Sequence, residues 1–234
     1  MKLTFIYNSG FLLETGNCNI LFDYYRKGHD IIRQLLTSPL PLYVLVSHSH
    51  ADHFNPDCLG WKSKHKAIHY IFSDELQSAV NGCDKDIVFL PVGGVYSDDV
   101  LKVEAFGSTD IGCSFYLTIG DTTVFHAGDL NNWHWSDEST PGETMQAEHN
   151  YIKQLDYLAA VHNTVHLAMF PVDARIGSDY ARGARQFLEA VHTDVFVPMH
   201  FWSAADAAAA FAPEAQKAGA RFVMLRRTGE WAEV

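Results

Sequence analysis

The chain has 234 residues, of which 47% are hydrophobic and 19% are charged, and its formal net charge is −11. This composition excludes an intrinsically disordered chain, because disordered segments carry too few apolar residues to form a core. The negative charge disfavours general electrostatic binding to nucleic acid. The length suits one α/β domain over residues 1–234. No apolar run reaches the length of a membrane span, so we expect a cytoplasmic protein without membrane contact.

The N-terminal part alternates short apolar runs with Gly and Asn turns, which is typical of strands. The expected strands are residues 3–7, 11–14 and 19–22. A helix over residues 30–36 follows, because it opens with an Asp and its apolar side chains recur on one face. A fully apolar strand over residues 42–46 comes next.

This apolar strand runs directly into a segment rich in metal-binding side chains. Within six residues lie three imidazoles and one carboxylate, namely His48, His50, Asp52 and His53. Chance produces such a pattern in only about a few chains per thousand, and the alternative is a solvated turn. Neutral imidazole and carboxylate suit zinc, and also manganese or iron. One metal needs only about three protein ligands, so four clustered candidates indicate two metals that share a loop.

The middle of the chain predicts a second strand-rich block. Short helices at residues 56–61 and from residue 73 flank a strand at residues 67–72. The strands of the block are expected at residues 87–90, 100–106, 113–119 and 122–125. Between the last two, Gly120-Asp121 predicts a tight hairpin turn.

The C-terminal third alternates helices and strands. The helices are expected over residues 144–161, 180–191 and 204–218, the last of them broken or kinked at Pro213. The strands are expected over residues 166–170, 195–199 and 221–225. Two sheets packed face to face with helices outside accommodate this order, although the pattern alone indicates only a layered α/β fold.

The motif His48-x-His50-x-Asp52-His53 after a hydrophobic strand resembles the signature of the metallo-β-lactamase superfamily. Three further strand ends follow in the order that this family uses, marked by Asp23, Gly128-Asp129 and His200. The compact chain and the sequence FHAGD at residues 125–129 look most similar to the branch that contains ascorbate-phosphate lactonase. The resemblance implies a four-layer αββα sandwich.

The resemblance also implies a ligand set for two ions. One ion would lie between His48 and His50, the other between Asp52 and His53, with Asp129 bridging both and His200 completing the second site. Asp52 would in addition orient a metal-bound hydroxide and accept a proton. Zinc is the metal expected first, with manganese or iron as alternatives.

One departure concerns the first metal site. The family usually has another His before Gly128-Asp129, whereas residues 103–112 contain none. Asp110 is an oxygen donor that could replace it, and a turn hydrogen bond is the alternative. His134 is a second candidate for the missing ligand. We expect Asp23 to hold a ligand by a hydrogen bond, and His126 to be structural because strand alternation turns it away from Asp129.

Several residues after strand ends are candidates for the substrate pocket. Arg175 has a planar guanidinium suited to a carboxylate or phosphate, while the alternative is a salt bridge with Asp173 that holds the loop. The segment from Asn131 to Trp135 is either a pocket wall or a surface loop anchored by its indoles. The residues considered for substrate binding are Asp173, Arg175, His134 and Trp202.

These observations predict a metal-dependent hydrolase that attacks an ester, lactone or phosphoester of a small molecule, with an anionic substrate left open. A nucleotide or RNA phosphodiesterase, a non-catalytic metal- or ligand-binding module and a di-iron redox enzyme are the alternatives. A homo-oligomer is left open. The cysteines show no Cys-x-x-Cys pattern, and we expect reduced thiols at Cys18, Cys58, Cys83 and Cys113.

Overall fold

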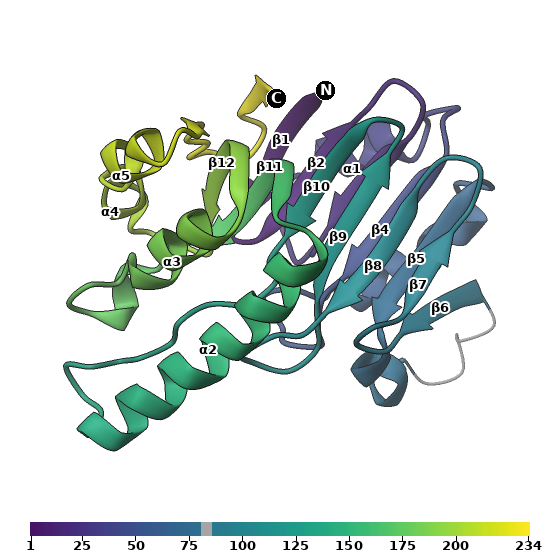
Figure 1. Ribbon diagram of the computed structural model, residues 1–234. Helices are drawn as coiled ribbons and strands as arrows, with labels where there is room; N and C mark the ends of the chain where they lie inside the picture. The colour runs from purple at the N-terminus through teal and green to yellow at the C-terminus, as the bar shows by residue number, and fades with distance from the viewer. Residues whose placement is uncertain (81–85) are drawn as a thin grey trace.

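The computed structural model describes residues 1–80 and 86–234, and in this part of the chain two seven-stranded sheets face each other (Figure 1). In spatial order the first sheet consists of β14 (Trp231–Glu233), β1 (Lys2–Tyr7), β2 (Gly10–Glu14), β3 (Asn19–Phe22), β4 (Leu42–Val46), β5 (Ile68–Ser73) and β6 (Ile87–Leu90). The second consists of β13 (Arg221–Phe222), β12 (His192–Met199), β11 (Thr164–Pro171), β10 (Thr122–His126), β9 (Ser114–Ile119), β8 (Lys102–Phe106) and β7 (Val95–Ser97). Strands β3 to β6 and β10 to β13 run parallel.

Helices cover the outer face of each sheet. The first sheet carries α1 (His29–Leu35) and the 3-10 helices η1 (Pro56–Ser63) and η2 (Asp74–Ser78). The second carries α2 (Pro141–Val161), η4 (Ala174–Ile176), α3 (Arg182–Ala190), α4 (Ala205–Ala209) and α5 (Ala212–Lys217). Figure 1 shows α2 and α3 in front of this sheet and the two chain ends side by side at the top. The αββα prediction is confirmed.

Strand β4, which precedes the predicted ligand loop of residues 48–53, is apolar throughout because both of its faces are buried. Its five residues are all buried, since Tyr43 and Leu45 enter the core between the sheets. The alternate residues Leu42, Val44 and Val46 pack under α1 and η1. A parallel strand covered on both faces has no solvent side, so it reads as a continuous hydrophobic run.

The structure corrects several element boundaries. Helix α2 begins at Pro141 rather than residue 144, because Thr140 forms a capping box with Glu143 and Pro is favoured at the first helical position. The predicted helix over residues 204–218 is interrupted after Ala209 and resumes at Ala212, next to Pro213. The last predicted strand is reduced to Arg221–Phe222, and the edge strands β7 and β14 were not predicted.

Two expectations concern the chain as a whole. Cys18, Cys58 and Cys113 are buried free thiols, whereas Cys83 lies outside the described residues. Among the helices of residues 1–80 and 86–234, none is both long enough and apolar enough to cross a membrane.

Candidate metal centre

The predicted ligands meet at one edge of the sandwich, because each follows the carboxyl end of a strand. The ligand loop from His48 to His53 follows β4, Asp110 follows β8, and Asp129 and His200 follow β10 and β12. Carboxyl ends of parallel strands point to the same edge, which is where α/β sheets place their sites. Their atoms form two groups that share this edge, His48/His50/Asp110/Asp129 and Asp52/His53/His200.

The second group is compact and buried. His200 Nε2 lies 3.3 Å from Asp52 Oδ2, and His53 Nε2 lies 3.5 Å from the same oxygen. Asp129 adjoins it, with Oδ1 at 3.1 Å from His53 Nε2 and 3.5 Å from His200 Nε2. Both imidazoles are almost fully inaccessible, at 0% and 4% side-chain exposure. This arrangement supplies two imidazoles and two carboxylates at one point.

The first group is more open. His48 Nε2 lies 3.5 Å from Asp129 Oδ2, so the two oxygens of this carboxylate face different groups. His50 Nδ1 lies 3.2 Å from Asp110 Oδ2, and their side chains are 49% and 35% exposed. Thr109 Oγ1 donates to Asn131 O at 2.6 Å, which ties the Asp110 segment to the loop of Asp129. Asp110 therefore stands where the first group lacks a third imidazole.

Unpaired buried atoms show that this donor set fits divalent ions. Within the described part of the chain, four atoms that face the centre have no hydrogen-bond partner: His48 Nε2, His53 Nε2, Asp129 Oδ1 and His200 Nε2. Burying a polar group without a partner is costly, so a cluster of such atoms requires an explanation. Imidazole nitrogens and carboxylate oxygens converging from several loops are the ligands of zinc, manganese and iron.

Buried Asp23 fixes two of the histidine rings. Its Oδ2 accepts from His53 Nδ1 at 2.7 Å and from Ser47 Oγ at 2.6 Å, and Oδ1 accepts from Ser47 N at 2.8 Å. Because the Ser47 hydroxyl donates to the carboxylate, its oxygen accepts from His48 Nδ1–H at 2.9 Å. Both Nε2 atoms are thus left as electron-pair donors toward the centre.

Asp173 plays the same part for His200. Its Oδ2 accepts from His200 Nδ1 at 3.0 Å and from Arg175 Nη2 at 2.6 Å, while Arg175 Nε lies 3.0 Å from Oδ1. Asp173 is fully buried and directed at His200 and Arg175, and its predicted part in substrate binding stays a prediction. The salt-bridge alternative for Arg175 is the contact observed, with the guanidinium 50% exposed and 5.0 Å from the ring of Trp202.

His134 does not belong to either ligand group. Its ring is 1% exposed and is held between backbone groups, with Nε2 donating to Asp179 O at 3.2 Å and Nδ1 accepting from Ser136 N at 3.1 Å. Both ring nitrogens are engaged by the backbone, so His134 offers no nitrogen to the first group, and its part in substrate binding stays a prediction. His126 is structural as predicted, since it stacks on Phe22 and donates to Ser9 O.

Three further residues lie beside the centre, and two of them, Asn8 and Glu75, were missed. Asn8 Nδ2 donates to Asp52 Oδ2 at 3.1 Å, and Glu75 accepts from the backbone N–H and, at 3.0 Å, from the hydroxyl of Ser49. Trp133 Nε1 donates to Asp129 O at 2.8 Å, and its ring lies 5.6 Å from that of His200. Only Trp133 had a signal, as part of the Asn131 to Trp135 segment. Trp202 meets His200 edge-on at 6.0 Å, and its role in substrate binding stays a prediction.

Burial and the neighbouring ionisable groups of the centre shift the pKa values of its ligands. Burial opposes ionisation of Asp129, but the neighbouring His53 and His200 outweigh it and keep the pKa of Asp129 below its usual range. Burial lowers the pKa of His48 to about 4. For His200, burial is outweighed by the neighbouring carboxylates of Asp129, Asp173 and Asp52, which raise its pKa to about 9. Such opposed shifts in one cluster mark functional sites.

Comparison with known proteins places this geometry among relatives. A family model described as the beta-lactamase superfamily domain matches residues 2–141. A protein named UPF0173 metal-dependent hydrolase from Desulforamulus reducens is 25% identical over 222 residues, which cover 86% of this chain and 84% of that protein. Another of that name from Symbiobacterium thermophilum is 25% identical over 243 residues, covering 98% of each.

Solved structures share the fold at lower identity. Igni18, a metallo hydrolase from Ignicoccus hospitalis, superposes with a TM-score of 0.71 at 17% identity, covering 99% of this chain and 97% of that one. CmlA, a diiron β-hydroxylase from Streptomyces venezuelae, superposes with a TM-score of 0.67 at 14% identity, covering 97% of this chain and 53% of that one.

Proposed function

Because the chain belongs to the metallo-β-lactamase superfamily, we propose that it is a metal-dependent hydrolase of a small-molecule ester, lactone or phosphoester. The observation that carries the proposal is the convergence of unpaired buried imidazole and carboxylate atoms into two adjacent groups. The relatives named metal-dependent hydrolase support the reaction class. The resemblance to ascorbate-phosphate lactonase stays a prediction about the substrate.

The residues that would hold the ions are those of the two groups. Divalent ions bound there would supply hydroxide at neutral pH, since they lower the pKa of water from about 15.7 to near 7, and would stabilise charge on a carbonyl or phosphoryl oxygen. Both groups combine two imidazoles with carboxylates, a donor set that suits zinc and also manganese or iron.

Asp52 is the residue best placed to handle a proton. Its side chain is 21% exposed, against 9% for Asp129, so it faces whatever enters the site. The hydrogen bond from Asn8 Nδ2 fixes one of its oxygens. A carboxylate held in this way can orient an attacking water, accept its proton and later return the proton to the leaving group.

The test is the substitution Asp52→Asn. We expect kcat to fall at least about a hundredfold, the lower range for a lost acid–base group, with unchanged circular dichroism. Phosphodiester, phosphomonoester and lactone substrates are screened with zinc, manganese and iron. Asp206→Asn, which alters a carboxylate 94% exposed on α4, serves as the control. Absence of turnover with every metal across the panel would instead favour a non-catalytic binding module, and turnover that needs no metal would contradict the metal-dependent mechanism.

A further inference from the structure

A cluster of two cations and two aromatic rings lies beside the metal centre. Arg26 Cζ is 4.9 Å from the ring of Tyr7 and 4.8 Å from that of Tyr25, and Lys27 Nζ is 4.1 Å from the ring of Tyr7. Arg26 Nη2 also donates to Tyr7 Oη at 3.1 Å. We call these four residues the aromatic–cation cluster. Both cations are exposed, while both rings are half-buried.

Two hydrogen bonds fasten the cluster to the ligand loop. Tyr7 precedes Asn8, whose side chain donates to Asp52 Oδ2 at 3.1 Å. On the other side, Asn55 Nδ2 donates to Tyr25 O at 2.7 Å, and Asn55 follows His53 by two residues. The segment that carries the cations begins directly after Asp23, which accepts from His53. The cluster therefore forms part of the rim around the centre.

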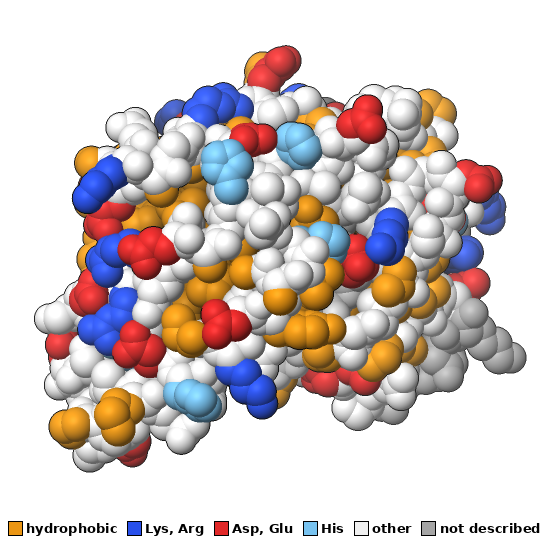
Figure 2. Space-filling view, in the orientation of Figure 1, with side chains coloured by type: hydrophobic (Ala, Val, Ile, Leu, Met, Phe, Trp, Pro, Cys, Tyr) orange, Lys and Arg blue, Asp and Glu red, His pale blue; other side chains and the backbone are white. Residues whose placement is uncertain are grey.

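The charge of the cluster is uncompensated. In residues 1–80 and 86–234, neither Arg26 nor Lys27 has a carboxylate within ion-pair distance. Arg175, the other cation at this rim, has its charge neutralised by buried Asp173. On the face seen in Figure 2, the Lys and Arg side chains at the left lie next to Asp and Glu. Other described cations, such as Lys153 and Lys217, also lack an ion pair, but Arg26 and Lys27 are fastened beside the ligand loop.

The backbone keeps this arrangement at a cost. Lys27 has φ 66°, a left-handed conformation that residues with a β-carbon rarely adopt, and Gly28 follows with φ 63°. Strain of this kind persists where the surroundings impose it and is concentrated at ligand sites. This conformation of Lys27 places its ammonium over the ring of Tyr7, whose hydroxyl also orients the guanidinium of Arg26. A solvated surface lysine gains nothing from such a conformation.

From these observations we infer that the aromatic–cation cluster binds an anionic group of the substrate, a carboxylate or phosphate remote from the bond that is cleaved. Arg26 is held through one edge by Tyr7, which leaves its remaining N–H groups for two parallel hydrogen bonds to an oxyanion. Lys27 adds a second charge. The inference rests on the proposed hydrolase function, and it assigns anion recognition to Arg26 and Lys27 instead of Arg175.

The test compares three anilides that differ only in their terminal group. N-phenylbutanamide ends in a methyl group, N-phenylsuccinamate in a carboxylate and N-phenyl-3-phosphonopropanamide in a phosphonate. Their affinities for the zinc-loaded holoenzyme are measured by isothermal titration calorimetry, which does not require turnover. We expect at least one anion to bind about tenfold or more tighter than the neutral anilide, and the better anion identifies the natural group.

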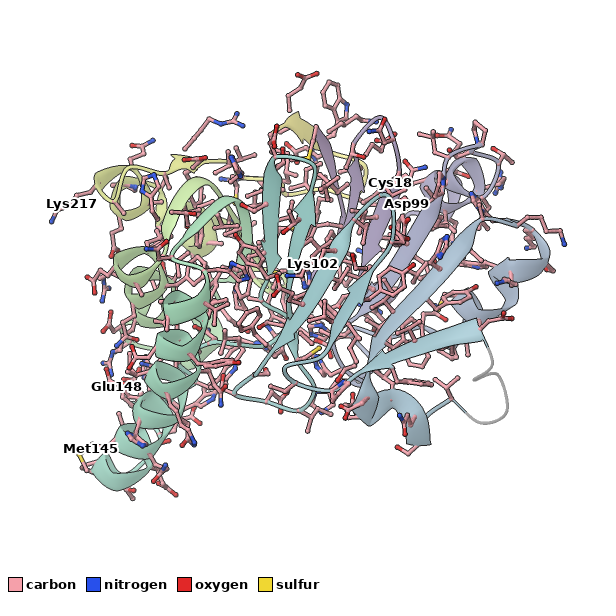
Figure 3. All side chains as sticks on the ribbon, turned by 45° about the vertical axis from the view of Figure 1, so that its right-hand side comes forward. Cys18, Asp99, Lys102, Met145, Glu148 and Lys217 are labelled. Atoms are coloured by element: carbon pink, nitrogen blue, oxygen red, sulfur yellow. The ribbon has the colours of Figure 1, made fainter. Side chains whose placement is uncertain are left out.

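Matched variants separate the cluster from the metals and from net charge. Arg26→Gln/Lys27→Gln should remove the preference for the anion and leave the neutral anilide unchanged. Lys153→Gln/Lys217→Gln changes the net charge equally and should keep the preference; Figure 3 shows Lys217 projecting from α5. Tyr7→Phe removes only the hydrogen bond to Arg26, so it should partially weaken the binding of the anionic anilides.

Two results would overturn the inference: no anion preference in the parent protein, or the same preference in Arg26→Gln/Lys27→Gln. Failure of the hydrolase proposal looks different. In that case the holoenzyme would hydrolyse no ester, lactone or phosphoester, whereas the loss of anion binding in the double variant would still be measured.

Discussion

Two buried carboxylates decide which nitrogen each ligand histidine turns toward the metal centre. Asp23 holds His53 directly and His48 through Ser47, while Asp173 holds His200. A carboxylate on the far side of an imidazole fixes the ring and makes the other nitrogen a better donor. The sequence indicated this role for Asp23 but assigned Asp173 to the substrate, because spacing does not show whether a loop carboxylate points inward.

The role of Asp173 can be measured through metal affinity. Asp173→Asn keeps the size of the side chain but removes the charge that supports His200, so we expect affinity at the second group to fall about 10–100-fold. Competition with a chelator of known affinity measures the change. Asp206→Asn on α4 is the control and should leave the affinity as it is. Equal affinity in Asp173→Asn and the parent would show that Asp173 only holds Arg175.

The histidines also predict how the metal-free protein responds to pH. The folded pKa of His200, about 9, lies above its unfolded value near 6.5, so its stabilising contribution is complete below pH 6.5 and is lost as the pH rises through 9. The folded pKa of His48, about 4, lies below 6.5, so stability falls as the pH drops from 6.5 toward 4. Stability should therefore be greatest near pH 6.5.

Urea unfolding of chelator-treated protein at several pH values tests this expectation. The loss above pH 6.5 should be on the order of 3 kcal/mol, the free energy that corresponds to the pKa shift of His200. In His200→Gln this upper limb should become shallower, and the part that remains belongs to His53, whose pKa is also raised because Asp129 outweighs its burial. Stability that climbs steadily from pH 6.5 to 9 in the parent would contradict the assignment.

At the scale of elements, glycine lets two loops close on the back of the ligand loop. Gly112 and Gly128 have positive φ, at 77° and 53°, and both lie against Ser47. A β-carbon at Gly112 would come within 2.1 Å of Ser47 O and 2.6 Å of His48 Cβ. Gly112 therefore allows the segment after β8, which carries Asp110, to pack against the start of the ligand loop.

This packing predicts a difference between two glycine substitutions. Gly112→Ala should displace the ligand loop, lower the free energy of unfolding by more than about 2 kcal/mol and weaken metal binding. Gly120→Ala is the matched control, because φ there is also positive, 56°, but no atom lies near its β-carbon. It should cost only about 1 kcal/mol of backbone strain and leave metal binding intact.

Thermal denaturation and metal titration of both variants measure the two effects. Equal losses of stability and an unchanged metal affinity in Gly112→Ala would show that the contact with Ser47 does not position the ligands.

The elements that sequence could predict are those with strong local signals. Strand β4 and the hairpin of β9 and β10 were found because their apolar runs and turn residues are decisive. The edge strands β7 and β14 have three residues each and form only by pairing with distant partners. Their register depends on tertiary contacts, which override local propensity.

The same limit applies to the site. Residues in the ligand motif could be predicted because they follow one strand within six positions. Asn8 and Glu75 could not, since neither carries a local pattern and each reaches the ligand loop only after folding. Asp110 was identified as the oxygen donor in an interval without His, and the structure places it 3.2 Å from His50. Its service as a ligand stays a prediction.

At the scale of the whole molecule, the sandwich brings Asn8, the ligand loop, Asp129 and His200 to one edge, although they lie far apart in the sequence. The two groups that result differ in accessibility, because the second is enclosed by Asp173 and Trp133 while His50 and Asp110 of the first face solvent. We therefore expect one tightly held ion and one that exchanges more readily. Figure 3 shows the N-terminal half of α2, with Met145 and Glu148, extending away from the two sheets.

The measurement that tests the central claim most directly is metal content. Elemental analysis is applied to protein purified without added metal and again after reconstitution with zinc, manganese or iron. We expect up to two ions per chain in the parent and one in Asp110→Ala, which should retain the ion of the enclosed second group. His53→Ala and His200→Ala should lose the tightly held ion. If these two variants bind as much metal as the parent does, the convergent imidazoles and carboxylates are not a metal centre.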